Sequence, residues 1–194
     1  MIDPSGRPQP RFPPDKEEIA REAIREKVGE IRAAAEKEDG AVILGIAGAS
    51  DAGDLLFHEA CHELEIPTHV LLPVPELVYR ATALSRQASR WAERSHAALR
   101  RAAVVRTLAP SVTMPGWLAA RPGYDTWQRN NRWILHHAWA NTTTDRETVL
   151  ALWNGQLGDG TGGVADMVAS GRERSADIIA LDTVALFGLS ESSQ

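Results

Sequence analysis

The sequence predicts an α/β fold of the Rossmann-like type, a three-layer sandwich around a mainly parallel sheet of about five strands. Short apolar runs alternate along the chain with segments of helical period, which is typical of βα units. Two of these runs end in turns rich in small residues, and each turn opens a helix. The 194 residues and the 43% apolar content suit a full core, so we expect a single domain over residues 1–194.

The first part of the chain is rich in proline and then becomes helical. Five prolines exclude a helix from residues 1–14, so we expect an extended segment there. Asp15, with Glu18 three residues later, suits a helix start, and Gly40 suits a helix end. These residues predict a helix over 15–39.

The rest of the chain alternates between strands and helices. The continuous apolar run 41–46 is typical of a parallel strand buried on both faces. Short apolar runs between turn residues predict further strands at 67–72, 103–108, 148–153 and 176–181. Helices are expected from the small-residue turn 47–54 to about residue 65 and at 89–102, 124–140 and 164–174, with 76–89 ambiguous, a long loop at 109–123 and a frayed tail at 190–194.

Composition and charge exclude several classes of protein. The 21 basic and 26 acidic side chains give a formal charge of −5, so broad nucleic-acid binding is not expected. The sequence holds no apolar run near the roughly 20 residues that span a membrane, and it starts without a signal-peptide core. Cys61 is the one cysteine, so no intramolecular disulfide is expected. The default expectation is a cytoplasmic protein.

Two glycine-rich turns form the expected ligand site. In an open parallel sheet, ligands bind beyond the carboxyl ends of the strands, where both turns are expected to lie. Glycines permit close approach, and the helix that follows offers free N–H groups and a positive dipole end, so a phosphate-bearing ligand suits such turns. The alternative is a flexible surface turn. The residues concerned are Gly48, Ser50, Asp51, Gly53 and Asp54 in the first turn and Gly158, Asp159, Gly160, Thr161, Gly162 and Gly163 in the second.

Polar side chains near these turns extend the candidate site. The aspartates could cap helices, or they could bind ribose hydroxyls, a base edge or a metal ion that accompanies the phosphate. In helix 124–140, Arg129 or Arg132 could neutralise a phosphate, and Asn130 or Asn131 could bind a base or a sugar. A solvated helical face is the alternative. Two adjacent asparagines form helices poorly, which favours a specific role for them.

A metal-binding pattern occurs in the helix after the first turn. His58-Glu59-Ala60-Cys61-His62 matches the H-E-x-x-H pattern of zinc peptidases, but the extended pattern is absent because Thr68 stands ten residues after His58. We expect Cys61 in the core and both histidines on a partly exposed flank. A zinc hydrolase is therefore a remote alternative, and no metal site is predicted.

Three stretches together resemble the SLOG group of Rossmann-like proteins, which includes the LOG phosphoribohydrolases and the DNA-processing DprA proteins. The stretches are Ile46–Ala60, Arg129–Trp133, and Leu152–Gly155 with Gly158–Asp166. The third stretch looks like a bacterial nucleotide-sensor-like variant of the group. The resemblance implies a Rossmann-like fold and a nucleotide-type ligand held by the two glycine turns.

Two departures from the SLOG pattern limit what it implies. Domains of this group begin with a central strand placed before the segment equivalent to Met1, so we expect such a strand upstream of this chain. The LOG hydrolases carry Pro-Gly-Gly-x-Gly-Thr-x-x-Glu, whereas here Thr161 is followed by Gly162, Gly163 and Val164, and Asp166 is offset by two. This difference weakens the expectation of hydrolase chemistry more than that of nucleotide binding.

Two functions are therefore expected from different classes. The first is a nucleotide-binding sensor or signalling domain, whose partner is a homodimer mate or an effector domain. The second is a LOG-like hydrolase of an N-glycosidic bond, with Asp166, Asp54 or Glu59 as the carboxylate. No cofactor is required, and Mg²⁺ could accompany a nucleotide. Six tryptophans suit core packing, with oligomer contacts as the alternative.

Overall fold

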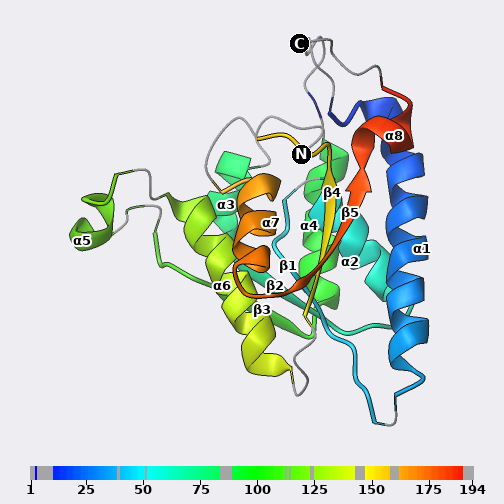
Figure 1. The fold of residues 1–194 in the computed structure, drawn as a ribbon. Helices are drawn as coiled ribbons and strands as arrows, with labels where there is room; N and C mark the ends of the chain where they lie inside the picture. The colour runs from blue at the N-terminus through cyan, green and yellow to red at the C-terminus, as the bar shows by residue number, and fades with distance from the viewer. Residues whose placement is uncertain are drawn as a thin grey trace.

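Helices and strands alternate along the computed structural model, which describes residues 3, 11–38, 40–50, 52–83, 89–111, 113, 115–122, 125–142, 147–157 and 162–189 (Figure 1). A 3₁₀ turn covers Pro14–Lys16. The strands are β1 (Gly45–Ala47), β2 (Thr68–Leu72), β3 (Val104–Thr107), β4 (Thr148–Trp153) and β5 (Asp177–Asp182). The helices are α1 (Glu17–Ala35), α2 (Gly53–Glu63), α3 (Glu76–Ala83), α4 (Ser89–Arg101), α5 (Gly116–Ala119), α6 (Thr126–Asn141), α7 (Val164–Arg172) and α8 (Thr183–Phe187).

The expected α/β class is confirmed, but the expected single sheet of about five strands is wrong for the described residues. The strands form two parallel sheets, one of order β1-β2-β3 and one of β4-β5. In the first sheet His69 of β2 pairs with Ile46 on one side and Val104 on the other, and in the second Leu150 pairs with Ile179.

The first strand is shorter than the sequence predicts. The apolar run 41–46 was expected to be a strand throughout, yet pairing begins only at Gly45 and the Val42 side chain is 86% exposed. With three residues, β1 forms a ladder to β2 alone, and no described strand connects β1 with β4.

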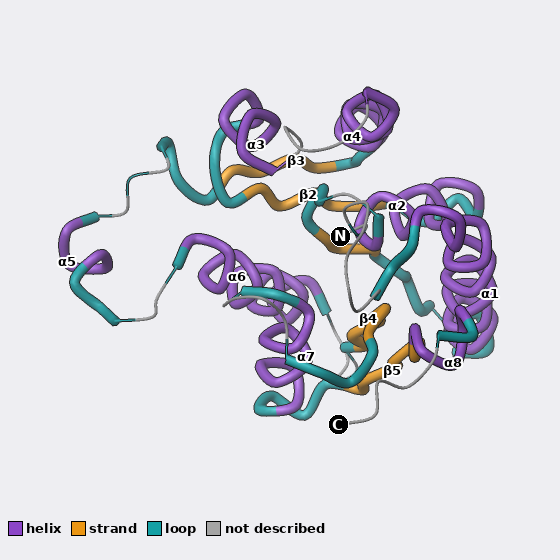
Figure 2. Tube along the Cα trace, turned by 90° about the horizontal axis from the view of Figure 1, so that it is seen from above, coloured by secondary structure: helices purple, strands orange, loops and turns teal. Residues whose placement is uncertain are grey.

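The helices lie on both faces of the sheets. Figure 2 shows α4 on one side of β2 and β3 and α6 on the other, and α2 packs beside α4 and against β1. Helix α7 contacts α6 and both strands of the second sheet. Helix α6 therefore touches the first sheet directly and the second through α7, which places it between the two expected ligand turns.

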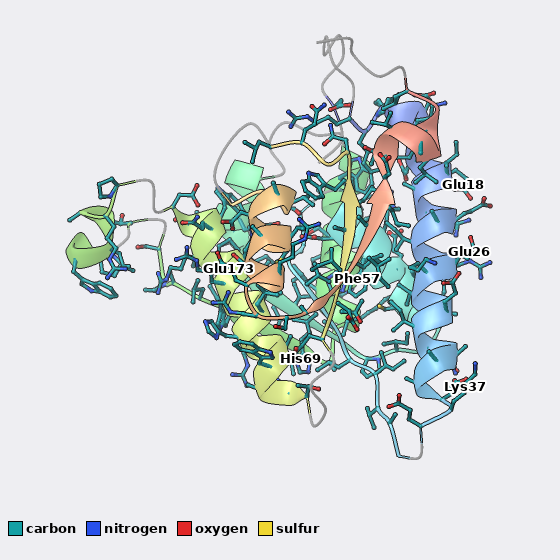
Figure 3. All side chains as sticks on the ribbon, in the orientation of Figure 1. Glu18, Glu26, Lys37, Phe57, His69 and Glu173 are labelled. Carbon is teal, nitrogen blue, oxygen red and sulfur yellow. The ribbon has the colours of Figure 1, made fainter. Side chains whose placement is uncertain are left out.

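The core follows the apolar faces of these elements. Leu55 and Leu56 of α2 and Val70 of β2 are fully buried, and burial of such a side chain is worth about 1.5–3 kcal/mol. Helix α1 contributes an apolar stripe of Ala20, Ile24 and Val28 at helical spacing. Its acidic side chains Glu18 and Glu26 project from the helix in Figure 3.

Three helices lie where the sequence predicts none or leaves the state open. Helix α3 occupies part of the ambiguous stretch 76–89, and α5 interrupts the expected long loop 109–123. Helix α8 follows β5 directly because the Asp182 carboxylate accepts a hydrogen bond from the backbone N–H of Val184 over 2.9 Å. Within the described ranges, no helix is both long and apolar enough to cross a membrane.

Candidate functional site

The first glycine turn connects β1 to α2 and is closed by an aspartate. The Asp54 carboxylate oxygen Oδ2 accepts hydrogen bonds from the Ser50 backbone N–H over 3.0 Å and from the Ser50 hydroxyl over 2.6 Å. A Cβ atom added to Gly48 would lie 2.7 Å from the same oxygen, so this carboxylate position requires glycine at 48. Gly53 begins α2 with open space around it, and Asp51 lies outside the described residues.

The start of α2 has an unusual backbone. Its N-cap residue is Ala52, which has a φ of 64° and no side chain able to cap the helix. Positive φ is uncommon for a residue with a Cβ atom and marks local strain. The Asp54 carboxylate in the first turn of the helix is the negative group that the positive helix end favours.

The second glycine turn connects β4 to α7 and packs closely on α6. Gly162 has a φ of 79°, and a Cβ atom added there would lie 2.4 Å from the Gln128 backbone nitrogen and 2.5 Å from Trp127 Cβ. Gly163 is the N-cap of α7 and supplies no capping side chain. The other expected ligand residues of this turn, Gly158, Asp159, Gly160 and Thr161, lie outside the described residues.

The two adjacent asparagines of α6 reach towards different turns. Asn130 Nδ2 donates to the Leu71 carbonyl over 3.2 Å, and that carbonyl lies 3.9 Å from the position of a Cβ atom added to Gly48. Asn131 Nδ2 contacts the carbonyl oxygens of Gly162 at 2.9 Å and Gly163 at 3.3 Å. One short segment of helix thus connects the surroundings of both glycine turns.

The alternative of a solvated helical face is wrong for Asn130, which is only 6% exposed. Its carbonyl oxygen Oδ1 is buried and has no hydrogen-bond partner within the described part of the chain. Successive residues of a helix point about 100° apart, so Arg129 and Asn131 lie on opposite flanks of Asn130. Arg132 is exposed. The two asparagines contact the end of β2 and the second glycine turn.

Asp166, in the first turn of α7, has both carboxylate oxygens bound by side chains of α6. Gln128 Nε2 donates to Oδ1 over 2.9 Å, and Asn131 Nδ2 donates to Oδ2 over 3.1 Å. Gln128 and Trp127 were not singled out as site residues from the sequence. The spacing of Trp127, Gln128 and Asn131 (i, i+1 and i+4) places all three near one helix face, which is the signal that could have identified them.

The residues of the zinc-peptidase pattern make other contacts. His58 is 3% exposed, which corrects the expected partial exposure, and its ring nitrogen Nε2 lies 2.8 Å from the Gly48 carbonyl. The expectation of partial exposure failed because α2 is covered by α1, α4 and β1. His62 is exposed as expected.

Glu59, a candidate carboxylate of the hydrolase alternative, is paired with arginine. Its two oxygens accept from Arg94 Nε over 2.6 Å and Nη2 over 2.5 Å, and Arg94 also pairs with Glu17. Both oxygens of this carboxylate are therefore occupied by charge-assisted hydrogen bonds. Among the residues that the structure describes, no three His, Cys, Asp or Glu side chains gather where they could hold a metal ion.

Cys61 lies in the core, as expected, and is 1% exposed. Burial raises the pKa of its thiol to about 12. Its sulfur faces β1, since a Cβ atom added to Gly45 would lie 2.9 Å from it. The side chain therefore packs as a small apolar group and offers no nucleophile.

Comparison with known proteins adds no relative to this description. Neither a protein-family model nor a curated protein sequence matches the chain.

Proposed function

We propose that this protein is a nucleotide- or nucleotide-derivative-binding domain that acts as a sensor or in signalling. The observation that carries the proposal is the bridge that α6 makes between the two glycine turns. Asn131 binds the backbone of the second turn and Asp166, while Asn130 lies beside the strand end next to Gly48. Two strand–turn–helix units that share one bridging helix suit a ligand that contacts both turns.

The chemistry of these groups suits the parts of a nucleotide. The starts of α2 and α7 lack side-chain caps, so their backbone N–H groups and positive helix ends can face a phosphate. Asp54 and Asp166 are acceptors for ribose hydroxyls. Arg129 is half-buried and has no ion-pair partner among the described residues, so its charge is available to an anion.

An aromatic side chain beside the second turn supports a base-binding role. Trp127 is 37% exposed, its Cβ borders Gly162, and its ring lies 5.9 Å from that of the buried Tyr79. A half-exposed indole that is held by a buried neighbour offers a face on which a base can stack. The orphan oxygen Oδ1 of Asn130 could accept from an amino group of a base or from a sugar hydroxyl.

The proposal is tested by adding AMP, NAD, ADP-ribose and a cyclic nucleotide separately to the full chain and following the melting temperature. A ligand at one hundred times its Kd should stabilise the fold by about 2.7 kcal/mol. The shift should be lost in Asn131→Ala and kept in Asn141→Ala, whose amide donates to the His137 carbonyl of its own helix. No shift with any nucleotide would refute the proposal for this chain.

Chromatography of the same mixtures separates binding from cleavage. Recovery of intact ligand supports the sensor function. Release of free base that stops in Asp166→Asn would instead identify the alternative, an N-glycosidic hydrolase in which the Asp166 carboxylate takes part. Gln128 and Asn131 hold the Asp166 carboxylate in one orientation, and this observation favours the hydrolase as the second candidate function.

A further inference from the structure

Helix α1 borders a shallow groove, at a point where a glycine interrupts its row of long side chains. The groove has a volume of about 410 Å³ and is lined by Glu22, Arg25, Glu26, Gly29 and Leu64. Gly29 has no side chain and Leu64, the C-cap residue of α2, is half-buried, so the middle of the groove is low and apolar. The exposed Glu22 and Glu26 stand at its rim.

Neither packing nor backbone conformation among the described residues requires a glycine at position 29. A Cβ atom added there would meet only Leu64 Cδ1, at 4.0 Å, which is an ordinary van der Waals distance. Gly29 also lies inside α1 and is not among the glycines of positive φ. A glycine inside a helix is less stable than an alanine, so this residue costs local stability and leaves an open groove in return.

The outer face of α6 carries an exposed tryptophan among basic side chains. Arg132, His136 and Trp139 are exposed and share one face of the helix, at positions i, i+4 and i+7. The Trp139 ring is 41% exposed, with the His136 ring centroid 5.9 Å away and the Arg174 guanidinium carbon 5.6 Å from its own centroid. Glu173 lies 3.9 Å from Arg174, but α6 itself contains no acidic residue.

We propose that the groove of α1 receives Trp139 from a second copy of this chain. The indole ring lies beside Gly29 and against Leu64, where it buries apolar surface that is exposed in the single chain. The basic groups that surround the ring then face the glutamates at the groove rim. Groove and tryptophan are therefore the two halves of one contact between copies.

The charges of the two surfaces support a second copy as the occupant. Arg25, the basic residue that lines the groove, lies 4.0 Å from Glu63 and is therefore partly neutralised. The outer surface of α1 carries four exposed glutamates at intervals of four residues, over about 18 Å of helix. These are Glu18 and Glu30, which pair with basic side chains of α1, and Glu22 and Glu26 at the groove. The acidic surface of one copy thus matches the basic face of α6 in the next.

The positions of the two helices make the contact head-to-tail. Figures 1 and 2 place α1 and α6 on different sides of the molecule, so one copy uses its groove and its tryptophan with two different neighbours. Contacts of this kind close into a ring or continue as an open chain. A single pair of helix faces is small for an interface, so we expect weak association that grows with protein concentration. The inference does not depend on nucleotide binding.

Sedimentation velocity of the full chain over a wide range of concentration is the test. We expect association in the wild type and at least about tenfold weaker association in Trp139→Ala, since truncation of a central interface aromatic costs a factor of this size or more. Trp117→Ala is the matched control. Trp117 on α5 is more exposed, at 70%, and its loss should change association by less than about twofold. A wild type that stays monomeric, or equal losses in the two variants, would overturn the inference.

Filling the groove separates association from folding. Gly29→Gln places a long side chain in the groove, and it should raise the urea midpoint of the chain because glutamine is the better helix former. The same variant should associate at least about tenfold more weakly, because the indole ring no longer fits. A loss of association in a more stable chain cannot result from unfolding. Unchanged association in Gly29→Gln would show that the groove is not the contact.

An exchange of charges tests which two surfaces meet. Arg132→Glu and Glu26→Lys should each weaken self-association, and an equal mixture of the two variants should restore it. In the mixture, the unchanged groove of one variant meets the unchanged α6 of the other, and the two altered surfaces are again opposite in charge. Arg100→Glu makes the same change at an exposed position of α4 and should leave association as it is. A mixture that associates no better than the single variants would contradict the pairing of α1 with α6.

Discussion

The Asn131 amide donates to the Asp166 carboxylate over 3.1 Å and joins α6 to the first turn of α7. The same amide nitrogen contacts the Gly162 carbonyl at 2.9 Å. One side chain thus fixes the end of the second glycine turn and the carboxylate that follows it. Gln128 supports the arrangement through the other carboxylate oxygen.

We therefore expect Asn131→Ala to destabilise the fold by about 1–3 kcal/mol. The substitution removes the amide that donates to the Gly162 carbonyl and to the Asp166 carboxylate, both of which are partly buried. Urea unfolding measures the change. Asn141→Ala, at the exposed end of the same helix, should change the free energy of unfolding by less than about 0.5 kcal/mol. Equal losses in both variants would show that Asn131 contributes helix propensity and no specific contact.

The backbone of Gly162 supports a second prediction. Gly155 and Gly162 have nearly the same φ, 77° and 79°, but an added Cβ atom would meet nothing within 4 Å at Gly155 and the Gln128 backbone at Gly162. Gly155→Ala should therefore cost about 1 kcal/mol from the left-handed conformation alone. Gly162→Ala should cost at least about 3 kcal/mol, because α6 must also move.

The comparison of the two glycine variants by urea unfolding separates conformational strain from packing. A nucleotide-induced rise in melting temperature should survive in Gly155→Ala and disappear in Gly162→Ala. If both variants lost the same stability, the close packing of the second turn on α6 would not be a property of the protein in solution.

A histidine pair predicts pH-dependent stability. His69 Nδ1 of β2, labelled in Figure 3, lies 2.9 Å from His137 Nε2 of α6. The ring centroids are 5.1 Å apart, so the rings meet almost end to end, as in a hydrogen bond from one N–H to one bare nitrogen. Burial lowers the pKa of both rings, and the nearby Arg106 of β3 adds to the effect.

The sign of the pH dependence follows from the lowered pKa values. The unfolded rings titrate near pH 6.5 and the folded rings below it, so the unfolded state binds more protons in between. The free energy of unfolding should therefore be greatest above about pH 7, fall as the pH drops through 6.5, and level off once the folded pKa values are passed. Buried His58, whose pKa is lowered as well, acts in the same direction.

Urea midpoints at about pH 7.5 and about pH 5.5 measure this difference. It should shrink in His137→Gln, because one shifted group and its contact with His69 are removed. The control is His136→Gln, which changes the neighbouring exposed histidine of α6 and should leave the pH dependence as it is. A pH dependence unchanged in His137→Gln would contradict the role of the pair.

The strand–helix alternation could be predicted because each element carries its own local pattern. Strand β4 covers residues 148–153, as expected from an apolar run bounded by turn residues. The division into two sheets could not be predicted, because strand pairing depends on distant partners. The run 41–46 has the composition of a buried strand, but only Gly45 and Ile46 within it pair with β2.

The candidate site, like the fold, could be predicted from the sequence only in part. The glycines and asparagines are visible in the sequence because they cost local stability in a helix or signal a turn. The contacts of Gln128 with Asp166 and of Glu59 with Arg94 join residues 38 and 35 positions apart, so helix spacing can mark Gln128 as a site residue but cannot show its partner. His58 was expected to be partly exposed because its neighbours in sequence place it on a helix flank, yet the packing of α2 buries this side chain and leaves His62, one turn further on, exposed.

The last prediction concerns Cys61, whose thiol is 1% exposed with a pKa raised to about 12 by burial. Because the thiolate is the reactive form, a thiol reagent should label the folded chain at neutral pH at least about a hundredfold more slowly than the chain in urea. Gly45→Ala would place a methyl group 2.9 Å from the sulfur, so this variant should unfold at lower urea and be labelled sooner. The control is Gly116→Ala, where the added methyl group meets nothing within 4 Å. Rapid labelling of the folded wild-type chain would contradict the packing of α2 on β1.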